Sequence, residues 1–287
     1  MKLALGTAQF GLDYGIANTG GKVASEEVHR ILRLALKHDI RTLDTAAAYG
    51  SSEEVLGKVG VGDFEVITKV PPIPANVGCI STWVEQSIES SLKALRVNTL
   101  SAVLLHRPMQ LFDEGGEAVY EAIQSFKVQG RIDKIGVSIY QPGELDTLLS
   151  HYHFDLVQAP FNLMDRRLLS SGWLGELNRR GIEVHARSVF LQGLLLMRPE
   201  DRPAYFRDWE NQLACYDSWL AEKNISAVRA CLGFACQQTG VHRVVVGVQS
   251  AAQLAELIVS VPRSELIIPD ALEVEDEELI NPAKWSL

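Results

Sequence analysis

The segment IRTLDTAAAYGSSEEVLGKV, residues 40–59, contains the structural unit from which the rest of the chain is built. Its short apolar run, residues 40–44, predicts a β-strand, and residues 51–59 predict a short helix. The strand ends on Asp44, and the turn between strand and helix carries Tyr49. In α/β proteins with parallel strands, the ligand site lies at the carboxyl ends of the strands, so both residues are candidates for such a site.

The same strand-then-helix unit recurs along the whole chain. Strands are predicted at residues 3–7, 40–44, 64–69, 100–106, 133–139, 154–159, 182–188 and 242–248. Helices are predicted at residues 25–39, 51–59, 81–96, 116–130, 142–151, 168–181, 226–240 and 250–261. The strands are short continuous apolar runs, as expected when both faces of a sheet are covered. Eight such units predict an α/β fold of the (β/α)₈ TIM-barrel class. A doubly wound open sheet is the alternative, but it usually has fewer strands.

We expect residues 1–287 to form a single barrel domain, and two segments interrupt its rhythm. Residues 8–24 are expected to form a Gly-rich loop at the catalytic mouth. Residues 189–225 are expected to form a long insertion whose aromatic side chains pack a helix onto the barrel (Trp209, Tyr216 and Trp219). A C-terminal tail begins at about residue 262, and its acidic part, residues 273–284, is expected to be a solvated surface segment.

Composition limits the possible classes of partner. The chain has 287 residues, of which 47% are hydrophobic and 22% charged, as in ordinary soluble globular proteins. Its net charge of −9 argues against binding to nucleic acid or to an acidic membrane surface. No apolar run approaches the ~18 residues of a membrane span, and none near the start has signal-peptide length. The four cysteines lack a CxxC motif, so we expect reduced thiols in a cytoplasmic protein.

Polar side chains stand at the ends of strands two to four in the predicted barrel. Asp44, Lys69 and His106 end their runs, and Tyr49 lies in the turn after the second strand. Each residue alone also has a structural explanation, such as a helix cap or a solvated side chain. Together, however, a barrel brings them to one mouth, where they can move a proton at neutral pH. An ammonium beside a phenol stabilises the phenolate, and a neighbouring carboxylate holds the ammonium in place. Neither a nucleophile with its base nor a metal-ligand cluster accompanies them, so no metal is expected.

At these residues the chain resembles the aldo-keto reductase superfamily. LDTAAAYGSSEEVLG resembles the Asp-and-Tyr signature of that family, ITKV its Lys strand and LLHRP its His strand. GTAQFG, KIGVSIY, LVQAPFN and VVVGVQSAAQL extend the resemblance over most of the chain. It implies a (β/α)₈ barrel that transfers a hydride between NADPH or NADH and a small carbonyl or alcohol substrate. It also implies a catalytic tetrad of Asp44, Tyr49, Lys69 and His106, with Tyr49 as the general acid in reduction.

The resemblance further implies a set of cofactor-binding residues. Ser138 and Gln158 match positions that hold the nicotinamide carboxamide, and Arg187 stands where an aromatic ring commonly stacks on the nicotinamide. The remaining positions are Gly6 and Thr7 in GTAQFG, and Gly193, Gly247, Gln249 and Gln253 in the pyrophosphate and adenosine region. Ile139 replaces the usual Asn, and GVQSAAQL has no Arg or Lys for a 2′-phosphate. The choice between NADPH and NADH therefore stays open.

Several alternatives remain at this point. The substrate is expected to be an aldehyde or ketone, such as a sugar or small metabolite. Its pocket is expected to be shaped by residues 8–24, by Trp83 or nearby side chains after the third strand, and by residues 189–225. Arg107 beside His106 suggests a polar or acidic substrate. One alternative is a non-catalytic barrel that binds nicotinamide nucleotides or senses their redox state. Another is an isomerase or lyase with no net use of NADH. The sequence leaves the oligomeric state open.

Overall fold

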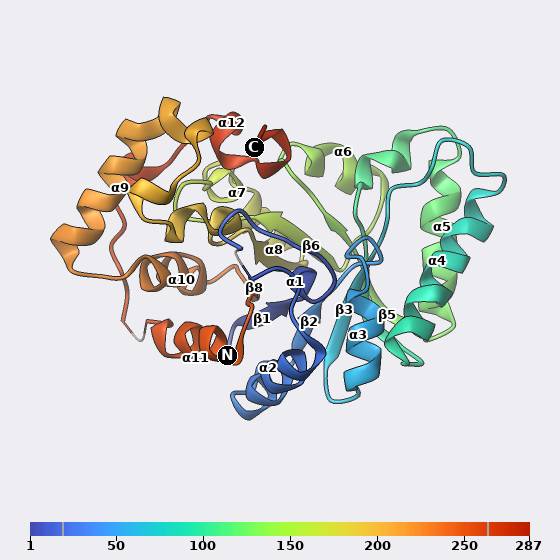
Figure 1. The fold of residues 1–287 in the computed structure, drawn as a ribbon. Helices are drawn as coiled ribbons and strands as arrows, with labels where there is room; N and C mark the ends of the chain where they lie inside the picture. The colour runs from blue at the N-terminus through green and yellow to red at the C-terminus, as the bar shows by residue number, and fades with distance from the viewer. Residues whose placement is uncertain (19, 263) are drawn as a thin grey trace.

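The computed structural model describes residues 1–18, 20–262 and 264–287. Eight parallel strands pair in sequential order, and β1 pairs with β8 to close the barrel (Figure 1). The strands are β1 (Leu3–Gly6), β2 (Thr42–Asp44), β3 (Glu65–Val70), β4 (Leu100–Leu105), β5 (Ile132–Ser138), β6 (Leu156–Pro160), β7 (Glu183–Arg187) and β8 (Arg243–Gly247). Each begins and ends within two residues of its predicted bounds. The predicted (β/α)₈ fold class is therefore confirmed, and the open sheet is excluded.

Helices follow the strands and surround the barrel (Figure 1). The longer ones are α2 (Ser25–Lys37), α3 (Ser52–Val59), α4 (Ile80–Leu95), α5 (Gly116–Val128), α6 (Glu144–His151), α8 (Trp173–Arg179), α9 (Glu210–Lys223), α10 (Ala227–Gln237) and α11 (Ala251–Ser260). Single-turn helices are α1 (Ala8–Gly11), α7 (Arg167–Ser170) and α12 (Glu277–Ile280). The 3₁₀ turns are η1 (Pro108–Phe112), η2 (Leu191–Leu196), η3 (Pro199–Asp201), η4 (Ala204–Trp209), η5 (Asp270–Leu272) and η6 (Pro282–Lys284).

Two predicted segments differ from the observed structure in their detail. The predicted loop of residues 8–24 begins with a helical turn, α1. The predicted helix of residues 168–181 is divided into α7 and α8, because Gly172 adopts a left-handed conformation with φ of 81°. Glycine has no Cβ and accepts that conformation at little cost, so it interrupts the helix there. Both differences are local and leave the order of the strands unchanged.

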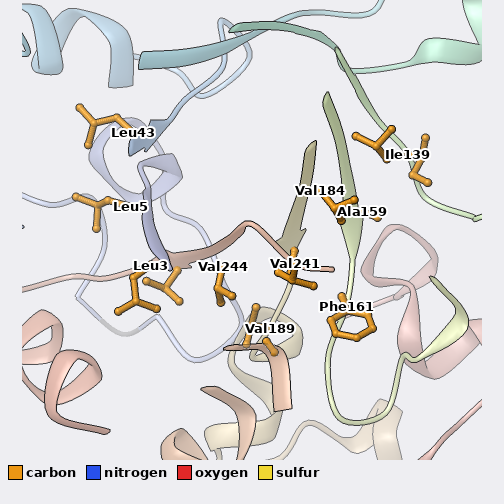
Figure 2. Close-up of a cluster of buried hydrophobic side chains, with 14 of the residues drawn as sticks. Leu3, Leu5, Leu43, Ile139, Ala159, Phe161, Val184, Val189, Val241 and Val244 are labelled. Carbon is orange, nitrogen blue, oxygen red and sulfur yellow. The ribbon is translucent and has the colours of Figure 1, made fainter. Parts of the chain in front are cut away.

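The main core lies between the strands and the helices. In α2, for example, Val28, Ile31, Leu32 and Ala35 are buried on one face, while Glu26 and Glu27 occupy the first turn. Figure 2 shows part of the large cluster, in which strand residues such as Leu5, Leu43, Val184 and Val244 take part. Burying an aliphatic side chain of this size contributes about 1.5–3 kcal/mol, so this layer provides much of the barrel's stability.

A polar network occupies the amino-terminal end of the barrel interior, where the sequence predicted apolar strands. Arg243 Nε donates a hydrogen bond to Thr42 Oγ1 at 3.0 Å. Glu183 accepts hydrogen bonds from Lys134 and from His185, with His185 Nε2 2.9 Å from Glu183 Oε1. Burial alone raises the pKa of Glu183, but these two partners outweigh it and lower the pKa to about 2. The glutamate is therefore ionised at neutral pH and holds this end of the barrel together.

The insertion and the C-terminal tail pack against each other. Tyr216 and Trp219 on α9 are buried in the core, as the packing interpretation predicted, and Tyr216 Oη donates to Leu195 O at 3.0 Å. Trp209 Nε1 donates to Asp276 Oδ2 at 2.9 Å, and the two segments lie side by side in Figure 1. The expectation that residues 273–284 form a solvated surface segment is wrong in part, because Val274, Leu279 and Ile280 are buried. Glu275, Asp276 and Glu278 of the same segment are exposed.

In the part of the chain that the structure describes, no helix combines the length and the apolar character needed to cross a membrane.

Candidate active site

A cavity of about 480 Å³ opens at the carboxyl ends of the strands. Its size is within the range of small-molecule and cofactor sites. Three residues of the predicted tetrad line it, namely Asp44, Tyr49 and His106. The predicted cofactor-binding residues line the same cavity: Gly6, Thr7, Ser138, Gln158, Arg187, Gly193, Gly247, Gln249 and Gln253. The structure therefore brings together residues from all over the chain, as the barrel prediction requires.

Lys69 lies beneath the floor of this cavity. The predicted strand ended at this residue, but β3 continues to Val70, so Lys69 is inside the strand. Its side chain is 1% exposed, and its Nζ donates to Asp44 Oδ2 at 2.8 Å and to Thr45 O at 3.0 Å. Nζ also donates to Tyr49 Oη at 3.5 Å. An ammonium has three N–H groups, and these three acceptors account for all of them.

The charge of Lys69 is stabilised by its neighbours. Burial alone lowers the pKa of Lys69, but the Asp44 carboxylate and Tyr49 outweigh this effect, and the net shift is upward. Asp44 is itself 5% exposed at its side chain, so the two charges form a buried ion pair. Such a pair is stable only when further hydrogen bonds satisfy its remaining atoms.

Gln158 supplies one of these hydrogen bonds, which the sequence did not predict. Its Nε2 donates to Asp44 Oδ1 at 2.7 Å, and Ser138 Oγ donates to Gln158 Oε1 at 3.3 Å. A continuous chain of hydrogen bonds thus runs from Ser138 on β5 through Gln158 and Asp44 to Lys69 and Tyr49. The resemblance assigned Ser138 and Gln158 to a cofactor amide. In the structure they also fix the carboxylate that orients the lysine.

His106 meets the edge of Tyr49. The ring centroids are 6.0 Å apart and the ring planes cross at 83°. Burial lowers the pKa of His106 first, and the positive charges of Lys69 and Arg187 lower it further, to about 4. The imidazole is therefore neutral at pH 7, with one nitrogen that donates and one that accepts a hydrogen bond. Nδ1 is buried and has no partner among the described residues.

The turn that carries Tyr49 depends on close packing against α1. A Cβ on Gly11 would lie 1.9 Å from Tyr49 O and 2.3 Å from Ser52 N, so no larger residue fits there. Thr7 ties the same turn to the barrel, because its Oγ1 donates to Asp44 O at 3.1 Å and accepts from Ser52 Oγ at 2.9 Å. The Gly-rich start of the chain thus positions the phenol.

A strained segment directly after β7 forms another wall of the cavity. Ser188, Leu191 and Gln192 have positive φ angles of 56°, 48° and 53°, which non-glycine residues rarely adopt. Gly193 follows with φ of 100°, and a Cβ there would lie 2.7 Å from Ala17 Cβ. The segment of residues 188–193 therefore touches the loop after α1 at the cavity. Strain of this kind persists only where surrounding contacts impose it, and it is common at ligand sites.

Comparison with known proteins bears directly on this arrangement. The family model described as the aldo/keto reductase family matches residues 2–267. The chain belongs to the aldo/keto reductase family.

Individual relatives of this aldo/keto reductase are distant. The uncharacterized oxidoreductase YtbE of Bacillus subtilis is 27% identical over 183 residues, which cover 60% of this chain and 62% of YtbE. The match thus spans less than two thirds of that protein. The L-glyceraldehyde 3-phosphate reductase of Escherichia coli K12 is 28% identical over 275 residues, covering 85% of this chain and 75% of that protein. The holo form of the aldo-keto reductase AKR11C1 from Bacillus halodurans has a TM-score of 0.74 at 20% identity, covering 93% of this chain and 88% of that one. This last likeness supports the barrel fold.

Two predicted pocket residues lie elsewhere in this aldo/keto reductase. Trp83 packs on α4 against the core and does not line the cavity, because α4 runs along the outside of the barrel. Arg107 is exposed and also does not line the cavity. The only cation among the described lining residues is Arg187. The expectation for Arg107 was wrong because nearness in sequence to a strand end does not decide whether a side chain lines the cavity.

Tyr14 and Phe190 line the cavity and lie within residues 8–24 and 189–225, the two segments that were expected to shape it. Sequence reasoning missed Tyr140, Glu256 and residues 282–283 of the C-terminal tail, which also line the cavity. They lie on a loop, on a helix and on the tail, so no periodic pattern marks them. Glu53, in the first turn of α3, is buried and accepts a hydrogen bond from Thr68 Oγ1 at 2.5 Å. Among the described residues, no group of three or more His, Cys, Asp or Glu side chains could hold a metal ion.

Proposed function

We propose that this protein reduces an aldehyde or ketone with NADH or NADPH as the hydride donor, and that Tyr49 is the general acid. The observation that carries the proposal is the position of Tyr49 Oη at the cavity, 3.5 Å from an ammonium that Asp44 holds at 2.8 Å. Reduction of a carbonyl needs a proton at its oxygen as the hydride reaches its carbon. A phenol that loses its proton next to a buried ammonium leaves a stabilised phenolate.

Each member of the tetrad has a distinct role under this proposal. Tyr49 Oη donates the proton to the carbonyl oxygen, and Lys69 stabilises the phenolate that remains. Asp44 keeps Lys69 charged and in place, with Gln158 as its second partner. His106 is neutral at pH 7, so its ring N–H donates a hydrogen bond to the same carbonyl oxygen without adding charge.

The lining of the cavity fits a nicotinamide nucleotide, which supplies the hydride when bound. At the tetrad end, His106 Nδ1 is a buried polar atom for which the described part of the chain offers no hydrogen-bond partner. Gly193 and Gly247 line the wall at tight approaches of neighbouring residues, since a Cβ on Gly247 would lie 2.6 Å from Gln9 Nε2. Ser138 and Gln158 offer an amide-binding pair at the tetrad end, while Gln249 and Gln253 lie by α11.

We further propose that NADH is preferred over NADPH. A 2′-phosphate adds about −1.5 to −2 charges and usually requires an Arg or Lys partner. Among the described residues of the α11 wall, Gln249, Gln253 and Glu256 line the cavity, and Glu256 carries a negative charge. We expect KM for NADH to be lower than KM for NADPH, and Glu256→Gln to narrow the difference. A lower KM for NADPH in the wild type would contradict this preference.

The test of the main proposal follows NADH absorbance at 340 nm with a panel of aldehydes. Tyr49→Phe should slow reduction by roughly 10²–10⁴-fold, while NADH binding measured by fluorescence titration stays unchanged. Tyr120→Phe is the matched control, because Tyr120 donates to His153 O at 2.7 Å and lies outside the cavity. Near-full activity in Tyr49→Phe would overturn the assigned acid. Tight NADH binding with no turnover of any carbonyl would instead favour a non-catalytic sensor.

A further inference from the structure

Arg187 carries a positive charge that has no carboxylate partner among the described residues. Other arginines close to this face of the barrel are paired: Arg167 lies 2.8 Å from Asp165, and Arg202 lies 2.6 Å from Asp217. Arg187 is half-buried, lines the cavity and forms no ion pair with a described residue. A guanidinium stays protonated at all ordinary pH values, so this charge is permanent.

Three contacts hold the guanidinium of Arg187 in a fixed place. It stacks on the ring of Tyr140 with its Cζ 4.7 Å from the centroid. Nη2 donates to Ile139 O at 2.9 Å, and Nη1 donates to Ser188 Oγ at 3.2 Å. A guanidinium has five N–H donors, so three remain, and Nε is buried without a hydrogen-bond partner in residues 1–18, 20–262 and 264–287. The side chain is therefore preorganised but not satisfied.

This charge lies at the same end of the cavity as Tyr49. The charge of Arg187 acts on His106 and on Tyr14, and both of these residues line the cavity. The other charges at this end cancel, because Asp44 is paired with Lys69 and His106 is neutral. The end of the cavity where the carbonyl would react therefore has a net charge of about +1.

We propose that Arg187 is a specificity-determining residue that binds an anionic group, a carboxylate or a phosphate, on the carbonyl substrate. This inference rests on the proposed reductase function and names the substrate class of the same site. A half-buried cation with free donors is costly unless a counter-charge arrives, and here the ligand is the source of that charge. Guanidinium N–H groups match carboxylate and phosphate oxygens in geometry, which makes Arg suitable for this role.

The test compares matched substrates that differ only in charge. One pair is 4-carboxybenzaldehyde and its methyl ester, and a second pair is glycolaldehyde phosphate and glycolaldehyde. In at least one pair, we expect kcat/KM to be at least about tenfold higher for the anionic substrate than for its neutral counterpart. The pair with the larger ratio shows whether the site prefers a carboxylate or a phosphate. Arg187→Met should lower kcat/KM for the anionic member roughly 10–100-fold, mainly through KM. Arg187→Lys should keep part of the preference for the anionic substrate. Arg107→Met removes an exposed cation outside the cavity, so it should leave the ratio of kcat/KM between the anionic and the neutral substrate unchanged.

A binding measurement separates this inference from the proposed function. Benzoate and inorganic phosphate are titrated by calorimetry into NADH-loaded protein, and NADH is titrated into wild type and Arg187→Met. With NADH saturating each protein, we expect one of the anions to bind the wild type and not Arg187→Met. Equal kcat/KM for charged and neutral aldehydes, or equal affinity of the two proteins for the anion, would overturn the inference while reduction itself persists. Failure of the reductase proposal has a different signature, namely no reduction of any aldehyde.

Discussion

Replacing Lys69 by methionine should damage both stability and activity, for reasons that can be worked out from the contacts of its ammonium. Lys69→Met keeps most of the apolar stem of the side chain but removes the ammonium, which leaves the buried Asp44 carboxylate with Gln158 as its remaining side-chain partner. Removing one partner of a buried ion pair typically costs about 3–5 kcal/mol. The two side chains are 1% and 5% exposed, so solvent relieves little of this cost.

Urea unfolding followed by tryptophan fluorescence measures the stability change. Lys69→Met should lower the free energy of unfolding by about 3–5 kcal/mol, and the double variant Asp44→Leu/Lys69→Met should be more stable than Lys69→Met because no isolated charge remains. Reduction should slow by roughly 10²–10⁴-fold, because the Tyr49 phenolate loses its counter-charge. An unchanged urea midpoint in Lys69→Met, or a normal rate of reduction, would refute this reasoning.

Three further changes have outcomes that follow from single observations. The pKa of Glu183 is lowered to about 2 from a model-peptide value of 4.5, so its stabilisation, roughly 3 kcal/mol, is complete above pH 4.5 and is lost as pH falls toward 2. The free energy of unfolding should therefore depend less on pH in Glu183→Gln than in the wild type. An identical midpoint of acid unfolding in the two proteins would count against this role of Glu183. Because the pKa of His106 is about 4, the pH profile of kcat/KM should show no inflection from this residue near pH 6.5. An inflection near pH 6.5 in the wild type that disappears in His106→Gln would contradict this prediction. Gly11→Ala places a Cβ 1.9 Å from Tyr49 O, so it should lower both the melting temperature and the rate of reduction. In Gly143→Ala the added Cβ meets nothing within 4 Å, so this control should change neither quantity by much. A normal rate of reduction in Gly11→Ala would show that the turn carrying Tyr49 tolerates the added methyl group.

The barrel was predictable because its signal is local and repeated. Each strand is a short apolar run bounded by turn residues, and sequential parallel strands with helical crossovers have few topologies to choose from. The convergence of Asp44, Tyr49 and His106 followed from the same reasoning, since the carboxyl ends of barrel strands share one mouth.

The remaining features depend on contacts between segments far apart in the sequence. Gln158 binds Asp44 across 114 positions of the chain, and only the strand register brings the two together. The segment of residues 188–193 has several positive φ angles that no local pattern announces. The tail reads as acidic and solvated, but its apolar residues between the charges bury themselves against the insertion. Arg107 shows the converse error, because it lies two residues after the end of β4 but does not line the cavity.

The central claim is that the phenol of Tyr49 and the ammonium of Lys69 work as one unit, and a double-mutant cycle on the reduction rate tests it most directly. Groups that act as a unit show strongly non-additive losses, so the double variant Tyr49→Phe/Lys69→Met should reduce an aldehyde at about the rate of Tyr49→Phe alone. If the two losses multiply instead, the side chains contribute independently, and the 3.5 Å contact between them has no part in the proton transfer.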